Sequence, residues 1–188
     1  MLNTLTLNHT LRTLYLVRHA HPQQNTGIAY DRVPGPPLDA LGQTEAQLAA
    51  RFLQPLGLQA LLCSPLLRTR QTADAIAATT GLVPLTAEPL AEHRSDETFD
   101  AVRARCATWL AHAESGPHAV LAVVTHGSPV RALLGLLSQN SLDLSRHSFA
   151  GGNPSPTAGI WRAERASTGW QLSFVFEPQA VSSTNTQS

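Results

Sequence analysis

The stretch that decides the fold is Leu14-Tyr15-Leu16-Val17-Arg18-His19-Ala20-His21. Its first four residues are aliphatic or aromatic, which is typical of a buried strand, and an arginine and two histidines follow closely. Open α/β sheets bind their ligands outside the carboxyl ends of the strands. The pattern therefore predicts a strand whose end carries a site, although an edge strand can also end in polar residues that have no such role.

The composition indicates one globular domain without a strongly charged surface. At 188 residues the chain can bury a substantial core without disulfides or metals. Its 13 basic residues balance 13 acidic ones, which argues against a nucleic-acid partner and against a polybasic membrane anchor. All the basic residues are arginine. No lysine is therefore present for Schiff-base chemistry, whereas arginine suits bidentate binding of phosphate or carboxylate.

The cysteines and the N-terminal residues favour a cytoplasmic protein. Cys63 and Cys106 are too few and too far apart for a disulfide framework or a thiolate zinc site, so we interpret them as core thiols in a reducing compartment. Residues 1–17 contain no apolar run of signal-peptide length, and no segment is long enough to span a bilayer. We expect cytoplasmic localisation and no membrane partner.

We expect the chain to divide into a flexible lead-in over 1–12, a single domain over 13–177 and a disordered tail over 178–188. Within the domain, short apolar runs alternate with segments of helical periodicity. After a loop from Pro22 to Gly42, helices are predicted over 44–53, from a Ser64 cap to Gly81, from Thr98 to Gly116, and from a Ser128 cap onward; strands are predicted over 60–63, 82–85, 119–124, 159–163 and 170–176.

This alternation predicts the fold and the position of the site. Strand and helix in turn indicate an α/β fold with three α/β/α layers and a mostly parallel central sheet. Because the carboxyl ends of parallel strands lie at one edge, residues far apart in the sequence should meet there. They are Arg18, His19, His21, the turn from Ser64 to Arg68, and His126.

Two kinds of chemistry suit such a group. His19 and His21 could begin a divalent metal site, but that site needs carboxylates from other strand ends, and the fixed charge of Arg18 would repel the metal. Alternatively, the arginines neutralise a phosphate while a neutral imidazole attacks phosphorus, and a helix N-terminus directs its N–H groups at the same anion. The second interpretation uses every member of the group and needs no metal or other cofactor.

Four segments in the same order resemble the histidine phosphatase superfamily, also called phosphoglycerate mutase-like. The family's Arg-His-Gly signature is similar to Arg18-His19-Ala20, followed by Asn25 at the matching distance; alanine replaces glycine, and His21 stands where the family usually has an acid. The other matching segments are Pro37-Leu38 with Gly42 and Glu45-Ala46, Ser64-Pro65-Leu66-Leu67-Arg68, and Val124-Thr125-His126-Gly127.

The resemblance implies that His19 is a nucleophile that forms a phosphohistidine, which water then hydrolyses. It also implies that Arg18, Arg68 and His126 hold the phosphoryl oxygens and that Asn25 lies close by. Physical chemistry agrees, because positioned cations stabilise the negative charge of a phosphoryl-transfer transition state. Nearby arginines also lower the pKa of a histidine and so keep it nucleophilic near neutral pH.

The proton donor for the leaving group is less clearly marked. By resemblance, Leu90-Ala91-Glu92 matches the family's acid segment and makes Glu92 the favoured residue. The family's usual continuation, a glycine followed by an aromatic-Glu-Gly group, is missing here. Asp96 and Glu97 therefore remain alternatives, and both could instead be first-turn carboxylates of the helix that begins near Thr98.

The resulting hypothesis is a metal-independent hydrolase, similar to histidine acid phosphatases, that cleaves a small-molecule phosphomonoester. His21, Tyr30 and Arg32 are candidates for contact with the organic part of the substrate. One alternative is mutase-type phosphoryl transfer, but the family's mutases have an extra capping segment and a lysine, whereas here the stretch from Glu92 to His126 is short. The other is a relative that binds phosphate without catalysis. The sequence indicates neither the substrate nor the oligomeric state.

Overall fold

The structure is a computed structural model, and it describes residues 10–178. Six strands form one mixed sheet in the order β3-β2-β4-β1-β5-β6. Its strands are β1 (Thr13–Arg18), β2 (Ala60–Cys63), β3 (Leu85–Thr86), β4 (Val120–Thr125), β5 (Ile160–Ala166) and β6 (Gly169–Phe176). Its helices are α1 (Ala40–Leu53), α2 (Leu67–Thr80), α3 (Phe99–Ser115) and α4 (Gly127–Leu137), with short 3₁₀ turns η1 (Gln54–Leu56), η2 (Glu88–Leu90) and η3 (Ala150–Gly152).

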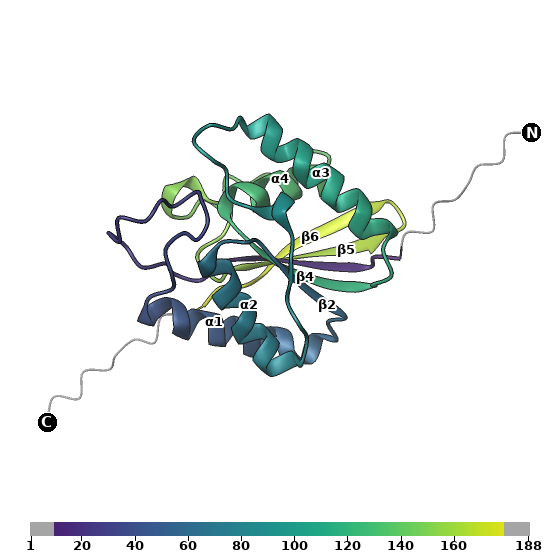
Figure 1. The fold of residues 1–188 in the computed structure, drawn as a ribbon. Coiled ribbons are helices and arrows are strands. Elements are labelled where there is room, and N and C mark those ends of the chain that lie inside the picture. Colours follow the sequence, from purple (N-terminus) through teal and green to yellow (C-terminus); the bar gives the residue numbers. More distant parts are fainter. Residues whose placement is uncertain (1–9, 179–188) are drawn as a thin grey trace, which may run out of the picture.

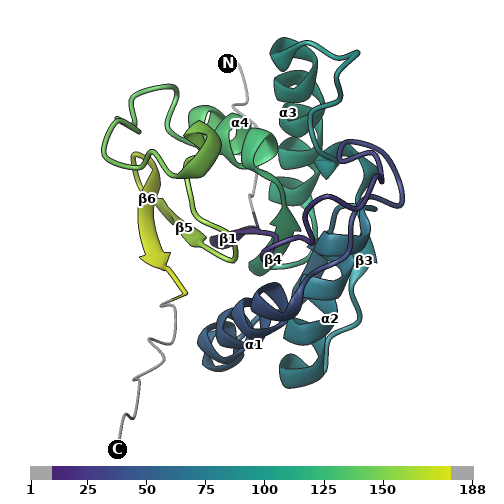
Figure 2. The ribbon, with the colours of Figure 1, turned by 90° about the vertical axis from the view of Figure 1, so that its left-hand side faces the viewer.

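The expected three layers are present (Figure 1). Helices α1 and α2 cover one face of the sheet, and α3 and α4 cover the other, as the turned view also shows (Figure 2). Strand β1 is buried on both faces because its side chains alternate between them. Leu14 and Leu16 pack into the core under α3 and α4, whereas Tyr15 and Val17 pack under α1 and α2.

Strand pairing places the site. Strand β1 runs parallel to β4, which runs parallel to β2, so the carboxyl ends of these three neighbours lie at one edge of the sheet. Strands β5 and β6 continue the sheet in antiparallel pairing beside β1. The mostly parallel α/β sheet predicted from the sequence is thereby confirmed, with its polar strand ends together.

Three helices begin at residues that the sequence did not indicate. Helix α1 begins at Ala40, four residues before its predicted start, because Asp39 caps it by accepting from the Gly42 N–H at 2.8 Å. Gly42 is needed inside this first turn, since a Cβ there would lie 2.0 Å from the backbone oxygen of His21. The prediction had treated Gly42 as part of the preceding loop.

The predicted serine caps of α2 and α4 are both wrong. Helix α2 begins at Leu67 with Leu66 at the N-cap, and Ser64 instead turns its hydroxyl toward His126. Helix α4 begins at Gly127 with His126 at the N-cap, so Ser128 lies inside its first turn. The serine-proline pairs resemble caps, but in both cases the tertiary structure places the helix boundary elsewhere.

The structure also bears on the predictions for the chain ends and the cysteines. Residues 10–12 of the expected flexible lead-in are held, because Leu11 is buried and the Thr10 N–H donates to Glu114. The rest of the lead-in and nearly all of the predicted tail lie outside the described residues. Cys63 and Cys106 are free and buried, as predicted. Within residues 10–178, no helix combines the length and the apolar character needed to span a membrane.

Candidate active site

The site lies where β1, β2 and β4 end. His19 directly follows β1, His126 directly follows β4, and Ser64 directly follows β2. Arg68 reaches the same place from the first turn of α2, and Arg18 is the last residue of β1. His19, Arg68 and His126 are fully buried. The structure therefore brings together the five residues that come from different strand ends, as the predicted topology requires.

The hydrogen bonds of His19 define which of its nitrogens can react. Its Nδ1 lies 2.8 Å from the backbone oxygen of Ala20. A carbonyl oxygen only accepts, so Nδ1 carries the proton and Nε2 keeps its lone pair in the neutral ring. The backbone fixes the residue as well, because the His19 N–H donates to Thr125 and the His19 oxygen accepts from Ala158. The protein therefore holds the His19 imidazole in one orientation, with its nucleophilic lone pair on Nε2.

Burial and charge keep this ring neutral. Burial, followed by the charges of Arg68 and Arg18, lowers the pKa of His19 well below its usual 6.5. The pKa of His126 is lowered in the same way, by burial first and then by Arg68. Both imidazoles are therefore unprotonated at neutral pH, which is the state in which a histidine can act as a nucleophile.

The two buried histidines should make the protein less stable in acid. Below about pH 6.5 the unfolded chain binds protons at these positions while the folded chain resists them, so the free energy of unfolding falls as the pH falls. We expect the melting temperature to drop by several degrees between pH 7.5 and pH 5, measured by circular dichroism. The drop should be smaller in His19→Asn and unchanged in His112→Ala, where the histidine is exposed. An equal drop in His19→Asn would contradict this account.

His126 is held between a guanidinium and a hydroxyl. The Nη2 of Arg68 lies 3.0 Å from Nδ1 of His126, and a guanidinium only donates, so Nδ1 is the unprotonated nitrogen. The other nitrogen, Nε2, then donates to the Ser64 hydroxyl at 2.7 Å. The rings of His19 and His126 are 5.1 Å apart. Ser64 therefore orients His126 toward Arg68 and His19.

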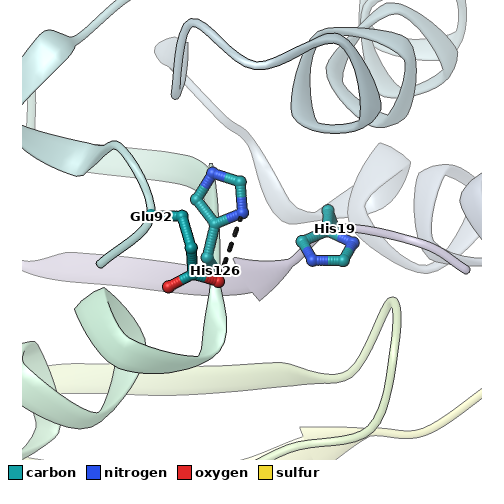
Figure 3. Close-up of side chains that lie close together, drawn as sticks. All are labelled: His19, Glu92 and His126. Atoms are coloured by element: carbon teal, nitrogen blue, oxygen red, sulfur yellow. Dashed lines mark ion pairs between the residues drawn. The ribbon is translucent and has the colours of Figure 1, made fainter. Parts of the chain in front are cut away.

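Glu92 is the carboxylate that reaches this group (Figure 3). One of its oxygens lies 3.7 Å from Nδ1 of His126, and the other accepts from the His93 N–H at 2.9 Å. The segment that carries Glu92 is tied to the end of β4, because the Thr125 hydroxyl donates to the backbone oxygen of Leu90 at 2.6 Å. Arg105 on α3 donates to the backbone oxygen of Glu92 at 3.3 Å. A carboxyl group is thus fixed beside two buried histidines.

The electrostatics of the site suit an anion. Nε of Arg68 and Nε of Arg18 are buried and have no hydrogen-bond partner among the described residues. Unpaired buried donors on charged groups are costly, so an acceptor is expected to satisfy them. Helix α4 also begins at Gly127, immediately after His126, and its free N–H groups add positive potential at this edge. A tetrahedral oxyanion would satisfy these donors.

A metal is the alternative ligand. His19, Glu92 and His126 each offer a ligand atom within 4.8 Å of the others, which is a possible metal triad. However, a guanidinium nitrogen already lies 3.0 Å from His126 Nδ1, and Arg18 and Arg68 place two fixed positive charges at the site. These charges would repel a divalent cation. The sequence also offered a metal bound by His19 and His21 as an alternative. In the structure, Nδ1 of His21 instead lies 2.8 Å from a carboxylate oxygen of Asp39.

Tyr30 covers the reactive nitrogen. Its hydroxyl lies 3.2 Å from Nε2 of His19, where it donates to the free lone pair. Its ring lies under the guanidinium of Arg68, with 3.9 Å between the guanidinium carbon and the ring centroid, and its backbone oxygen accepts from Arg68 at 2.9 Å. An atom that reacts with Nε2 must come within roughly 3–3.5 Å of it. The phenol therefore occupies the position of the incoming atom.

Removing this phenol should help an anion to bind. One neutral hydrogen bond contributes about 1 kcal/mol net, so we expect Tyr30→Phe to bind inorganic phosphate about fivefold more tightly than the original protein. Isothermal titration calorimetry measures this directly. The Phe variant keeps the ring against Arg68, whereas Tyr30→Ala removes both contacts and serves as the comparison. Weaker phosphate binding in Tyr30→Phe would show that the hydroxyl is a ligand of the anion and does not compete with it.

The remaining predicted residues are divided between the site and the surface. His21 and Tyr30 line a cavity of about 490 Å³ beside Arg18. Asn25 is exposed, has a left-handed backbone (φ 54°), and does not line this cavity. Arg32 also lies outside it, because its guanidinium pairs with exposed Asp96 at 3.0 Å.

The alternative carboxylates are both engaged away from the histidines. Asp96 pairs with Arg94 as well as with Arg32, and Glu97 pairs with Arg105 at 2.8 Å. Glu97 also lies before helix α3, whose N-cap is Thr98. Of the three carboxylates considered from the sequence, Glu92 is therefore the one that the structure brings to His126.

Several residues of the site had no signal of their own in the sequence. Ser64 was interpreted as a helix cap, and its hydrogen bond to His126 becomes visible only when β2 and β4 are paired. The cavity is completed by residues from loops far apart in the chain: Pro22, Gln24, Phe149, Ala150, Pro156 and Thr157. Gly127 leaves room beside His126 for the Asn153 side chain, which would have to move if Gly127 carried a Cβ.

Comparison with known proteins assigns the sequence to a family. The sequence profile of the histidine phosphatase superfamily (branch 1) matches residues 14–96 and 88–176, which together cover most of the chain. An uncharacterised protein of Picosynechococcus is 39% identical over 121 residues, which are 60% of this chain and 65% of that protein. An uncharacterised protein of Mycobacterium tuberculosis is 40% identical over 65 residues, 35% of this chain and 32% of its own length. The matched region thus covers less than two thirds of these relatives.

A solved structure confirms the fold independently. The mycobacterial glucosyl-3-phosphoglycerate phosphatase aligns with a TM-score of 0.67, covering 87% of this chain and 97% of its own, at 22% sequence identity. At this identity the likeness concerns the fold.

Proposed function

Because this chain belongs to the histidine phosphatase superfamily (branch 1), we propose that it is a phosphomonoesterase that hydrolyses a small phosphorylated metabolite through a covalent phosphohistidine. The observation that carries the proposal is the state of His19. Its ring is buried and neutral, its Nδ1 proton is held by Ala20, and its Nε2 keeps a lone pair that can attack phosphorus once the substrate displaces the Tyr30 hydroxyl. Two guanidiniums with unpaired buried nitrogens lie beside it. The site therefore contains a nucleophile and two guanidiniums that can stabilise the negative charge of the phosphoryl-transfer transition state.

The proposed reaction has two steps. In the first, the lone pair of His19 Nε2 forms a bond to phosphorus while the bond from phosphorus to the ester oxygen breaks, and Glu92 gives its proton to the departing alcohol. Arg18 and Arg68 hold the phosphoryl oxygens throughout, and His126 positions the Arg68 guanidinium, from which its Nδ1 accepts a hydrogen bond. In the second, the Glu92 carboxylate takes a proton from a water molecule as the water oxygen forms its bond to phosphorus. The N–P bond breaks with its electron pair returning to His19 Nε2, and inorganic phosphate leaves with Glu92 protonated again. The fixed charges of the arginines supply the stabilisation, so no metal is needed.

Phosphoryl transfer to a second hydroxyl is less well supported than hydrolysis. By resemblance, mutases of the superfamily have an additional capping segment between the acid and the second histidine. Here the chain between Glu92 and His126 consists of a short turn, α3 and β4, and it has no room for such a segment. The chain also has no lysine. The buried free thiols of Cys63 and Cys106 support the further proposal that the enzyme works in the reducing cytoplasm.

A substrate screen with trapping of the intermediate tests the proposal. The purified protein is assayed for phosphate release from sugar phosphates, nucleotides, phosphoglycerates and phosphopeptides, with and without EDTA. We expect hydrolysis of at least one class at equal rates under both conditions, and an acid-labile, base-stable phosphoenzyme after rapid quenching. Activity lost in EDTA and restored by zinc or manganese would contradict the metal-free reaction. Binding of inorganic phosphate without any turnover would favour the non-catalytic alternative.

A further inference from the structure

The cavity beside Arg18 has a composition that restricts the leaving group. It measures about 490 Å³ and is lined by Tyr30, Phe149, Pro22, Pro156 and Ala150, which supply apolar surface, and by Arg18, His21, Gln24 and Thr157, which supply polar groups. Pockets of this size with a few placed polar groups are typical of small-molecule sites. Because Arg18 is needed for the phosphoryl group in the proposed function, the other polar groups remain for the organic part of the substrate.

His21 is a positioned hydrogen-bonding group in this wall. Its Nδ1 lies 2.8 Å from a carboxylate oxygen of Asp39, whose other oxygen accepts from the Gly42 N–H at 2.8 Å. Burial raises the pKa of Asp39, but the hydrogen bonds from Gly42 and His21 outweigh burial and lower it, so the carboxylate is ionised. An ionised carboxylate only accepts, and Nδ1 of His21 therefore carries a proton. The nitrogen that is left for a ligand is Nε2.

Two carboxylates, those of Asp39 and Glu45, contact residues that line this cavity. Glu45 accepts from the His21 N–H at 2.8 Å with one oxygen and from the Thr157 hydroxyl at 2.9 Å with the other. Together with Asp39, it places two negative charges next to two residues that line the cavity. Arg18 is the one arginine among the lining residues. In the proposed function Arg18, and Arg68 behind Tyr30, are engaged by the phosphoryl group. A second anionic group that reached His21 and Thr157 would therefore be repelled by these two carboxylates.

From these contacts we infer that the cavity selects phosphomonoesters of uncharged, hydroxyl-bearing alcohols, such as sugar phosphates, and that His21 Nε2 binds a hydroxyl of the leaving group. Hydroxyls both donate and accept, so they suit His21, Gln24 and Thr157 together. The faces of Tyr30 and Phe149 provide apolar surface for the carbon skeleton. Esters of carboxylated alcohols are disfavoured. The inference rests on the proposed phosphatase function and adds the chemical class of its substrate.

Three substrates test the selectivity of the original protein. Glucose 6-phosphate has a neutral, hydroxylated leaving group, 3-phosphoglycerate has a carboxylated one, and phenyl phosphate has neither feature. We expect kcat/KM for glucose 6-phosphate to exceed that for 3-phosphoglycerate by about tenfold or more. Equal values, or a preference for 3-phosphoglycerate, would overturn the inference and leave the phosphatase function standing. A protein that hydrolyses none of the three but releases phosphate from nucleotides or phosphopeptides would overturn the inference alone. A protein that is inactive on every class of phosphomonoester would overturn the function and the inference together.

Two variants test the residues. In His21→Ala, the ratio of kcat/KM for glucose 6-phosphate to that for phenyl phosphate should fall about fivefold, the loss of one hydrogen bond. Asp39→Asn keeps an oxygen for the Gly42 N–H but removes one negative charge, so the preference for glucose 6-phosphate over 3-phosphoglycerate should narrow. His112→Ala, at an exposed position on α3, should preserve both ratios. Unchanged ratios in the first two variants would overturn the roles of His21 and Asp39.

Discussion

We expect His19→Ala to lose phosphatase activity by roughly 10⁴- to 10⁶-fold and to form no phosphoenzyme. The reason is that the N–P bond of the intermediate has no other atom on which to form. His126 is the nearest imidazole, but its Nδ1 accepts from Arg68 and its Nε2 donates to Ser64. It therefore lacks a free lone pair directed at a substrate. Activity is measured as phosphate release, and the intermediate by acid-labile incorporation of labelled phosphate.

The controls for this variant separate chemistry from folding. His19 is fully buried, so alanine leaves a cavity, and the melting temperature of the variant must show that it is folded at the assay temperature. His19→Asn fills more of the space and should be equally inactive. His112→Ala removes an exposed histidine and should retain full activity. A phosphoenzyme that persists in His19→Ala would show that another residue is the nucleophile.

Much of the fold could be predicted because its signals are local. The uniformly apolar stretch before Thr125 and the alternation of strands with helices indicate a doubly covered parallel sheet. Helix α3 was placed correctly because Thr98 caps it by accepting from the Ala101 N–H. The start of α1 was misplaced because its local cap, Asp39, was not recognised in the preceding loop. At α2 the side chain of Ser64, which was taken for a cap, contacts His126 on another strand end, and this contact is not visible in the sequence.

The site could be predicted only as a set of strand ends. Arg18, His19, Arg68 and His126 follow from the topology. Arg18, His19 and His126 lie at or directly after the end of a parallel strand, and Arg68 lies in the first turn of the helix that follows β2. Contacts that depend on side-chain direction did not follow. Nothing in the sequence indicates that the hydroxyl of Tyr30 reaches His19 Nε2. Nor does it show that Arg32, two residues later, turns away to pair with Asp96.

The largest expected effect after that of His19 is a loss in Glu92→Gln that depends on the leaving group. A glutamine cannot give a proton to the departing oxygen, and general acid catalysis contributes about 10²- to 10⁴-fold. We expect kcat/KM for an alkyl phosphate to fall by this factor, whereas kcat/KM for p-nitrophenyl phosphate should fall far less, because nitrophenolate leaves without protonation. This parameter covers the steps up to release of the leaving group, so slow hydrolysis of the phosphoenzyme does not obscure it.

Asp96→Asn is the matched control, since Asp96 is an exposed carboxylate on the same segment that pairs with Arg32 and Arg94. This variant should leave kcat/KM for the alkyl phosphate and for p-nitrophenyl phosphate unchanged. Glu97→Gln weakens an ion pair with Arg105, which also donates to the backbone of Glu92. This variant should lower the melting temperature, whereas the ratio of kcat/KM between the two substrates should change little. Because Glu92 alone of the three lies beside His126, a leaving-group-dependent loss in Asp96→Asn, with Glu92→Gln active, would reverse the assignment of the acid.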